Sequence, residues 1–244
     1  QLVVKVAAKR VQVDEAWSFV GAKQKNASDE QKAQGMGDAW TWIALDSDSK
    51  LVISWLVGGR DAEYAHAFMD DVAKRLANRV QLTTDGHKPY LEAVEGAFGC
   101  DVDYAMLIKE YGCVGSQKSP DTRYSPSVCT GAEKRPITGS PDPKYINTSH
   151  VERYNLTMRM CMRRFTRLTN AFSKKIANHE HAVALHTFHY NFCRIHQTLR
   201  VTPAMEAGLV DRVWDLEEIV SRLVAEEDAA ELALGPRRTR GKGA

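Results

Sequence analysis

The order of segments in the first 112 residues is the feature that most constrains the fold of this chain. Three short segments rich in β-branched and aromatic residues come first, and two helical patterns then alternate with two more short apolar segments. The expected strands are residues 11–20, 40–45, 51–57, 80–84 and 102–108, and the expected helices are residues 61–78 and 90–98. A strand meander followed by alternating helices and strands predicts an α/β fold, a mixed sheet with helices packed on it.

Turn and capping residues lie where these segments should begin and end. Residues 46–49 (DSDS) separate the second and third strands and predict a hairpin turn. Asp61 is a good N-cap for the helix that follows it. Pro89 suits the first turn of the next helix, and Gly99 suits its end.

The second half of the chain has the pattern of a long loop followed by helices. Residues 1–112 form the first part of the core, and residues 113–147, rich in Pro, Gly and Ser, predict a long loop insertion. Residues 148–205 should complete the core with one helix over about 148–168 and another over about 178–196. Residues 206–244 should form a C-terminal helical extension, an acidic helix over 210–233 and then a basic, disordered tail.

Charge is nearly balanced overall, at +2, but it is unevenly distributed. Residues 150–200 contain many cations and only two acids, Glu152 and Glu180. The cations are Arg153, Arg159, Arg163, Arg164, Arg167, Lys174, Lys175, Arg194 and Arg200. A solvated helix face would usually interleave acids for pairing within the helix, so this stretch predicts a polyanionic partner. No apolar run is long enough to span a bilayer, and no membrane partner is expected.

Three carboxylates lie where a metal site for phosphodiester chemistry would need them. Asp14 lies in the middle of an apolar strand, Asp85 at the carboxyl end of another strand, and Glu152 in the first turn of the basic helix. An acid within an apolar strand must be exposed, paired or bound to a metal, and open sheets bind ligands at the carboxyl ends of their strands. Carboxylate oxygens suit Mg²⁺, and two such ions serve phosphodiester cleavage.

Each acid also has a structural interpretation. Asp14 could be a buried acid with a structural partner, Asp85 before a glycine could be a turn residue, and Glu152 could stabilise the helix dipole. Other acids compete for the same roles, namely Asp46, Asp48, Asp70, Asp71, Asp101 and Asp103. Spacing alone leaves both interpretations open.

The helix that begins near Glu152 also has groups suited to DNA. An amide and a guanidinium follow the acid at helical spacing on one face, and a second guanidinium would extend that face by one turn. One guanidinium can donate two parallel hydrogen bonds to the oxygens of a phosphate. Two residues just after Asp85 could contact phosphates as well, with simple surface exposure as the alternative. The candidate DNA-binding residues are Asn155, Arg159, Arg163, His87 and Lys88.

Five segments resemble bacterial insertion-sequence transposases of the IS-one family, within the wider DDE transposase and integrase superfamily. They are VDEAWSFVG, TTDGHKPYLEAVE, SHVERYNLTMRM, FSKK and YNFCRIHQTLRVTPAMEAG, and the resemblance runs from about Val11 to Gly208. It implies a ribonuclease-H-like fold with a five-stranded mixed sheet. By motif match, Asp14, Asp85 and Glu152 take the roles of catalytic residues and metal ligands.

The resemblance also implies an activity and partners. The expected activity is that of a transposase, which uses two Mg²⁺ (or Mn²⁺) ions to cleave DNA at transposon ends and then joins the 3′-hydroxyl to target DNA. The partners would be terminal inverted repeats and target DNA, bound by a homo-oligomer in the bacterial cytoplasm and associated with the nucleoid. The alternatives are a plain nuclease of the same fold and an inactive DNA-binding remnant.

The beginning of the chain suggests that it is a fragment of a longer protein. The first residue is not Met, and the family's N-terminal DNA-recognition part has no counterpart before Val11. We therefore expect another segment to precede this chain.

Overall fold

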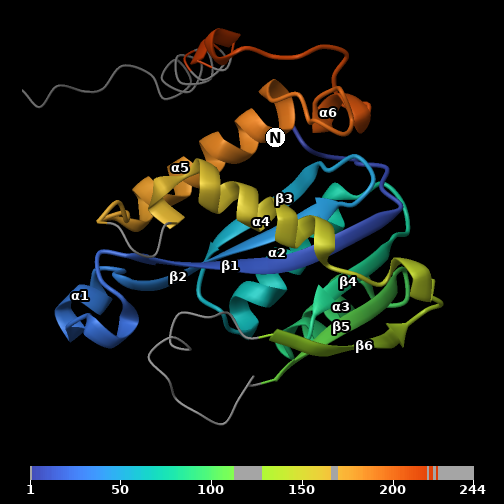
Figure 1. Ribbon diagram of the computed structural model, residues 1–244, viewed down its shortest axis with the longest axis horizontal. Helices are drawn as coiled ribbons and strands as arrows, with labels where there is room; N and C mark the ends of the chain where they lie inside the picture. Colours follow the sequence, from blue (N-terminus) through green and yellow to red (C-terminus); the bar gives the residue numbers. More distant parts are fainter. Residues whose placement is uncertain (1, 113–127, 166–169, 219, 222–223, 225–244) are drawn as a thin grey trace, which may run out of the picture.

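A six-stranded mixed sheet lies at the centre of the computed structural model, which describes residues 2–112, 128–165, 170–218, 220, 221 and 224 (Figure 1). The strand order is β3-β2-β1-β4-β5-β6. The strands are β1 (Arg10–Val20), β2 (Gly37–Asp46), β3 (Val52–Gly58), β4 (Gln81–Asp85), β5 (Asp103–Gly112) and β6 (Val128–Thr138). Strands β1, β2 and β3 form antiparallel pairs. Strand β4 pairs parallel with both β1 and β5, and β6 pairs antiparallel with β5. The predicted meander and the parallel units after it are confirmed.

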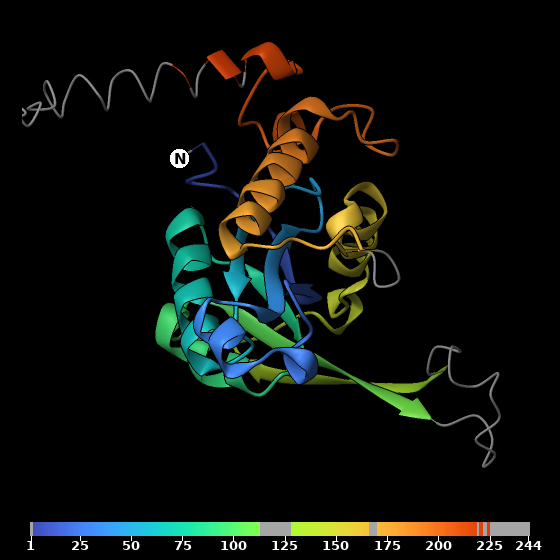
Figure 2. The ribbon, with the colours of Figure 1, turned by 90° about the vertical axis from the view of Figure 1, so that its left-hand side faces the viewer.

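The prediction of five strands was wrong, because β6 lies within the segment expected to be a loop. This strand pairs with β5 at the edge of the sheet, and Pro136 lies opposite Ala105. A proline is tolerated on an edge strand because its missing N–H removes no ladder bond from a second neighbour. Strand β6 contains Pro, Gly and several charged residues, so its sequence does not have the pattern of a strand. Figure 2 shows β5 and β6 extending together away from the body of the molecule.

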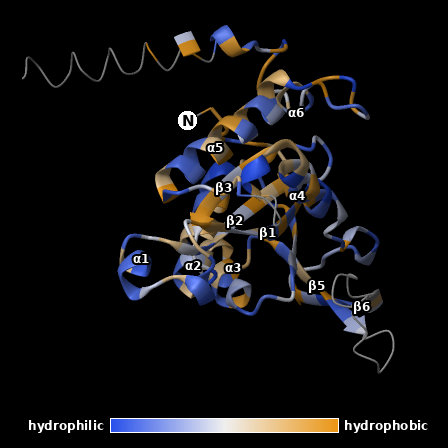
Figure 3. Ribbon diagram, turned by 60° about the vertical axis from the view of Figure 1, so that its left-hand side comes forward, coloured by the Kyte–Doolittle hydropathy of each residue, from blue (hydrophilic) through white to orange (hydrophobic). Residues whose placement is uncertain are grey.

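Helices cover both faces of the sheet. One face packs against α2 (Ala62–Arg75) and α3 (Pro89–Phe98), and the other packs against α4 (Ser149–Cys161), with α5 (Ile176–Phe188) beside it (Figures 1 and 2). Strand β1 serves both cores because its side chains alternate. Val11 and Val13 belong to the core with α2 and α3, whereas Ala16 and Val20 belong to the core with α4. In Figure 3 the central strands are more hydrophobic than the outlying helix α1 (Asp29–Ala33).

Three of the four predicted helix ends of the first half are confirmed, whereas α2 ends at Arg75 and not near residue 78. The Asp61 carboxylate accepts a hydrogen bond from the Tyr64 amide, 3.2 Å away, and so caps α2. Pro89 lies in the first turn of α3, and Gly99 ends the helix with a φ of +55°, a conformation that glycine adopts without strain. Helix α1 and the 3-10 turn η1 (Gln24–Asn26) were not predicted from the sequence.

The helices of the second half end earlier than predicted. Helix α4 ends at Cys161 and not near residue 168, because the chain turns at η4 (Arg163–Phe165) and buries the Phe165 ring. That ring contacts the ring of His179 on α5, with 4.9 Å between the centroids. Helix α5 continues as a π-helical turn, η5 (His189–Cys193), and α6 (Pro203–Glu206) follows. Before α4, the chain forms the 3-10 turn η3 (Pro143–Tyr145).

Half of the predicted acidic helix (210–233) and all of the basic tail lie outside the described residues, and residues 210–215 are not helical as predicted. Residues 216–218, 220, 221 and 224 are helical. Within the described part of the chain, no helix combines the length and the hydropathy needed to cross a membrane.

Candidate metal and DNA site

The two aspartates come together because their strands are parallel neighbours. Gln12 of β1 is the partner of Thr83 on β4. Asp14 and Asp85 each lie two residues further along their strands, so the pairing brings the two aspartates side by side. Asp85 is also the last residue of β4, where the sheet opens toward a loop. Sequence reasoning placed both acids on strands, and the pairing of β1 with β4 makes them neighbours.

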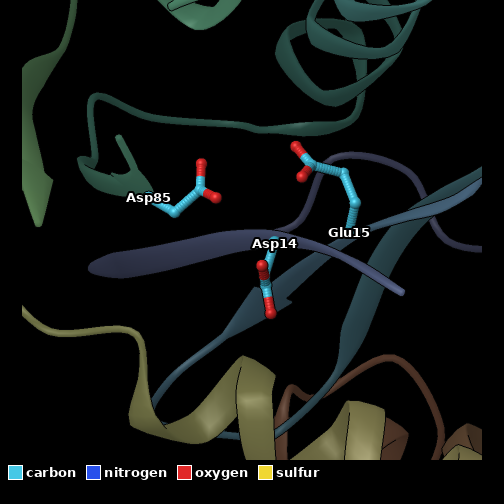
Figure 4. Close-up of side chains that lie close together, drawn as sticks. All are labelled: Asp14, Glu15 and Asp85. Atoms are coloured by element: carbon cyan, nitrogen blue, oxygen red, sulfur yellow. The ribbon is translucent and has the colours of Figure 1, made fainter. Parts of the chain in front are cut away.

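Glu15 joins the two aspartates in a cluster of three carboxylates. One oxygen atom from each of Asp14, Glu15 and Asp85 lies within 4.8 Å of the others. Figure 4 shows Asp14 and Glu15 leaving β1 on opposite sides, with Asp85 beside the strand. The cluster therefore reaches around one strand, with Asp14 toward α4 and Glu15 toward α3.

The Asp14 carboxyl is difficult to ionise in this position. Burial, together with the negative charges of Asp85 and Glu152, raises its pKa to about 7. The Asn155 side-chain N–H donates a 2.8 Å hydrogen bond to Asp14 Oδ2 and partly offsets this rise. A cation placed among these carboxylates would remove the repulsion, which is the electrostatic condition for a metal site.

Glu15 is the most buried member of the cluster, with 1% of its side chain exposed. Burial, together with the negative charge of Asp85, raises the pKa of Glu15 to about 7. The Arg60 guanidinium forms an ion pair with Glu15 Oε2 at 3.1 Å and with Asp85 Oδ2 at 3.5 Å. Arg60 is therefore the cation that balances the cluster on the α3 side.

Glu152 lies near this cluster but points its carboxylate to other partners. It occupies the first turn of α4, as predicted, and influences the pKa of Asp14 through space. Its Oε1 atom accepts hydrogen bonds from the Lys109 ammonium and the Thr148 hydroxyl. The structure therefore brings Asp14 and Asp85 together and leaves Glu152 beside them, held by Lys109.

The candidate DNA-binding residues fall into two groups. Lys88 and Arg163 are exposed, and Arg159 is partly exposed, but Arg163 follows the end of α4 and does not extend its face by a turn as predicted. Asn155 is 4% exposed, and its side-chain amide donates a hydrogen bond to Asp14, so Asn155 orients the Asp14 carboxylate. The His87 ring packs against Trp42 and Tyr90, and its backbone N–H donates to Asp85 Oδ1 at 3.0 Å.

The donor set fits a hard divalent cation such as Mg²⁺. The cluster offers carboxylate oxygens, and among the described residues Glu15 Oε1 is buried without a hydrogen-bond partner. A buried, unpaired carboxylate oxygen is costly unless a cation or proton satisfies it. Two ligands from one strand, together with Asp85 and the nearby Glu152, could surround such an ion.

Sequence reasoning missed Glu15, Arg60 and Lys109. The signal for Glu15 was the Asp-Glu pair within an apolar strand, because two consecutive acids place one carboxylate on each face of the sheet. Arg60 and Lys109 had no signal, because a cation is recognised as a counter-ion only after its carboxylate partners are placed.

Comparisons with known proteins give weak structural similarities. No protein-family sequence profile and no curated protein matches the chain. One similar structure is a chain of the cryo-EM structure of the simian T-cell lymphotropic virus intasome in complex with PP2A regulatory subunit B56 gamma. It has a TM-score of 0.46 and 13% identity over 83% of this chain and 55% of that chain.

A second similar structure is the cryo-EM structure of the piggyBac transposase synaptic complex with hairpin DNA. Its TM-score is 0.33, with 11% identity over 74% of this chain and 45% of that chain. The present chain therefore spans about half the length of both solved chains.

Proposed function

We propose that this chain is the catalytic part of a DDE transposase, which cleaves DNA at transposon ends and joins the freed 3′-hydroxyl to target DNA. The observation that carries the proposal is the convergence of Asp14 and Asp85 from neighbouring parallel strands, with Glu15 within the same 4.8 Å cluster. The motif resemblance, which places both aspartates in the sequence setting of that family, supports the same conclusion.

Each acidic residue has a defined role in this proposal. Asp14 and Asp85 hold the divalent ions, and Glu152 becomes a third ligand after it leaves Lys109. When bound, two Mg²⁺ or Mn²⁺ ions would supply Lewis-acid stabilisation of the attacking and leaving oxygens. Asn155 keeps the Asp14 carboxylate in one orientation through its 2.8 Å hydrogen bond. The backbone N–H of His87 does the same for Asp85.

DNA would lie along the basic end of α4 and the loop after β4. Arg159, Arg163 and Lys88 are the proposed phosphate contacts, and such contacts position DNA without reading its bases. The terminal inverted repeats and the target DNA are the proposed partners. A homo-oligomer that holds two ends, and a location in the bacterial cytoplasm, complete the proposal.

Incubation with labelled DNA and Mg²⁺ tests the activity. A duplex that ends in the element's inverted repeat is mixed with a supercoiled target plasmid, and the products are resolved on a denaturing gel. Joined products support a transposase. Cleavage without joining indicates a plain nuclease, and DNA binding without cleavage indicates an inactive remnant.

Substitution of the acids tests the assignment of residues. Asp14→Asn, Asp85→Asn and Glu152→Gln should each reduce cleavage by at least about 100-fold and leave DNA binding nearly unchanged, because they remove metal-binding charge and no phosphate contact. Asp101→Asn is the matched control, because the Asp101 side chain is 79% exposed and lies outside the cluster. Near-normal cleavage by any of the three variants would show that its residue is misassigned.

A further inference from the structure

Arg60 occupies a central position beside the acidic cluster. Its guanidinium contacts Glu15 Oε2 at 3.1 Å and Asp85 Oδ2 at 3.5 Å, and so bridges two carboxylates that would otherwise repel each other. The same guanidinium lies over the Trp40 ring, 4.7 Å from its centroid. The Arg60 side chain is 34% exposed, so part of its surface is shielded from solvent.

The loop that carries Arg60 is held on both sides. The Trp42 indole N–H donates a 2.9 Å hydrogen bond to the Gly59 carbonyl, and Asp61 begins α2 as its N-cap. A Cβ atom at Gly58 would lie 1.9 Å from the Tyr64 ring, so the loop packs closely against α2. These contacts fix the backbone next to Arg60 and leave its side chain as the part that can move.

Several buried polar atoms around Arg60 lack partners. Among the described residues, Glu15 Oε1, the Tyr90 hydroxyl and His87 Nε2 are buried without a hydrogen bond of regular geometry. The Tyr90 ring contacts the His87 ring, and hydrogen bonding between the Tyr90 hydroxyl and the Glu15 carboxylate lowers the pKa of Glu15 and raises that of Tyr90. Glu15 Oε2 is therefore paired with Arg60, whereas Glu15 Oε1 is buried and makes no hydrogen bond of regular geometry.

We propose that Arg60 is an internal counter-cation that holds Glu15 and Asp85 together until a divalent ion binds, and that the ion must displace Arg60 from Asp85. In this arrangement Glu15 serves as the anchor of Arg60 and as a further carboxylate facing the ion. Arg60 is a positioning residue, and its competition with the ion sets the metal affinity of the site. This inference rests on the proposed function, because it requires the cluster to bind metal.

The physical basis is the repulsion between two cations that share one set of ligands. Mg²⁺ or Mn²⁺ would lie about 2 Å from the oxygens that it binds, which puts it within a few ångströms of the guanidinium as placed here. Removal of the charge at residue 60 should therefore tighten binding, by about tenfold. A lysine keeps the charge but cannot form the planar fork of arginine, so it should restore affinity to within about threefold of the wild type.

Mn²⁺ affinity, measured on the full chain at pH 8 by electron paramagnetic resonance of the free ion, tests this inference. Titrations compare the wild type, Arg60→Gln, Arg60→Lys and Asp85→Asn. Arg75→Gln is the matched control, because it removes another arginine–carboxylate pair, with Asp71, outside the cluster. A melting curve in EDTA checks that each variant folds, and Arg60→Met replaces Arg60→Gln if the latter does not fold.

The outcomes separate the inference from the proposed function. Tighter Mn²⁺ binding by the neutral variant, with near-wild-type binding by Arg60→Lys and by the control, supports Arg60 as the counter-cation. Equal or weaker binding by the neutral variant overturns that role, provided that Asp85→Asn abolishes binding. If Asp85→Asn binds Mn²⁺ as the wild type does, the ion is bound elsewhere and the proposed function itself fails.

Discussion

The Asp14→Asn variant should be more stable than the wild type in the absence of metal. Asp14 has a folded-state pKa of about 7 against an ordinary value of 3.8, because burial and the charge of Asp85 oppose its ionisation. An asparagine has the same shape and can still accept the hydrogen bond from Asn155. The substitution therefore removes an unfavourable charge and retains the contact.

The size of the effect follows from the shift of the pKa. A shift of about three units corresponds to about 4 kcal/mol when the group is fully ionised, at about 1.4 kcal/mol per unit. Neighbouring acids share this cost, so we expect a gain of about 2–4 kcal/mol in the free energy of unfolding at pH 8. For a chain of this size the melting temperature should rise by about 5–10 °C.

The pH dependence gives the sign of the effect. An acid whose folded-state pKa is raised costs nothing below its unfolded pKa, and its cost grows between about pH 4 and pH 7. The advantage of Asp14→Asn should therefore be full at pH 8 and fall to about a third at pH 5.

Urea unfolding in EDTA at both pH values measures this advantage. Asp101→Asn is the control, because Asp101 is exposed and outside the cluster. Millimolar Mg²⁺ should stabilise the wild type and have little effect on Asp14→Asn, since a ligand stabilises only the form that binds it. If Asp14→Asn is less stable than the wild type at pH 8 in EDTA, the reasoning from carboxylate repulsion is refuted.

Three further predictions address the rest of the molecule. Arg159→Ala should weaken binding to specific and random DNA alike. In titrations across a salt series, the slope of log binding constant against log salt concentration should fall by about one unit. An unchanged slope with a lower melting temperature would show that Arg159 has a structural role. Burial lowers the pKa of His179 to about 4, so the contribution of His179 to stability should fall by up to about 3 kcal/mol between pH 6.5 and pH 4, and the difference in urea titrations between the wild type and His179→Gln should show this component. Gly58→Ala should destabilise the protein by about 1–3 kcal/mol, because the added methyl meets the Tyr64 ring, whereas Gly96→Ala, with ordinary contacts, should not.

Local patterns in the sequence were sufficient to predict most of the first half of the fold, although not α1 and η1. The hairpin between β2 and β3, the cap at Asp61 and the helix end at Gly99 all depend on residues within a few positions of one another. The strand positions of Asp14 and Asp85 were predictable for the same reason, since a strand is visible as a short β-rich run.

Edge strands and helix ends were less predictable. The composition of β6 is that of a loop, and it becomes a strand because β5 offers a free edge for pairing. Helix α4 stops at Cys161 because Phe165 turns into the core and meets His179 from another helix. Neither cause is visible within the segment concerned.

The sequence by itself determined that Asp14 and Asp85 lie on strands and that Glu152 lies near the start of a helix. Only the tertiary structure decided that Glu15 completes the cluster, that Arg60 bridges it and that Lys109 holds Glu152 to one side. The reason is physical: the pairing of β1 with β4 and the packing of α3 and α4 on opposite faces set the distances between charges. Electrostatic interactions depend on those distances and on burial, which spacing along the chain does not encode.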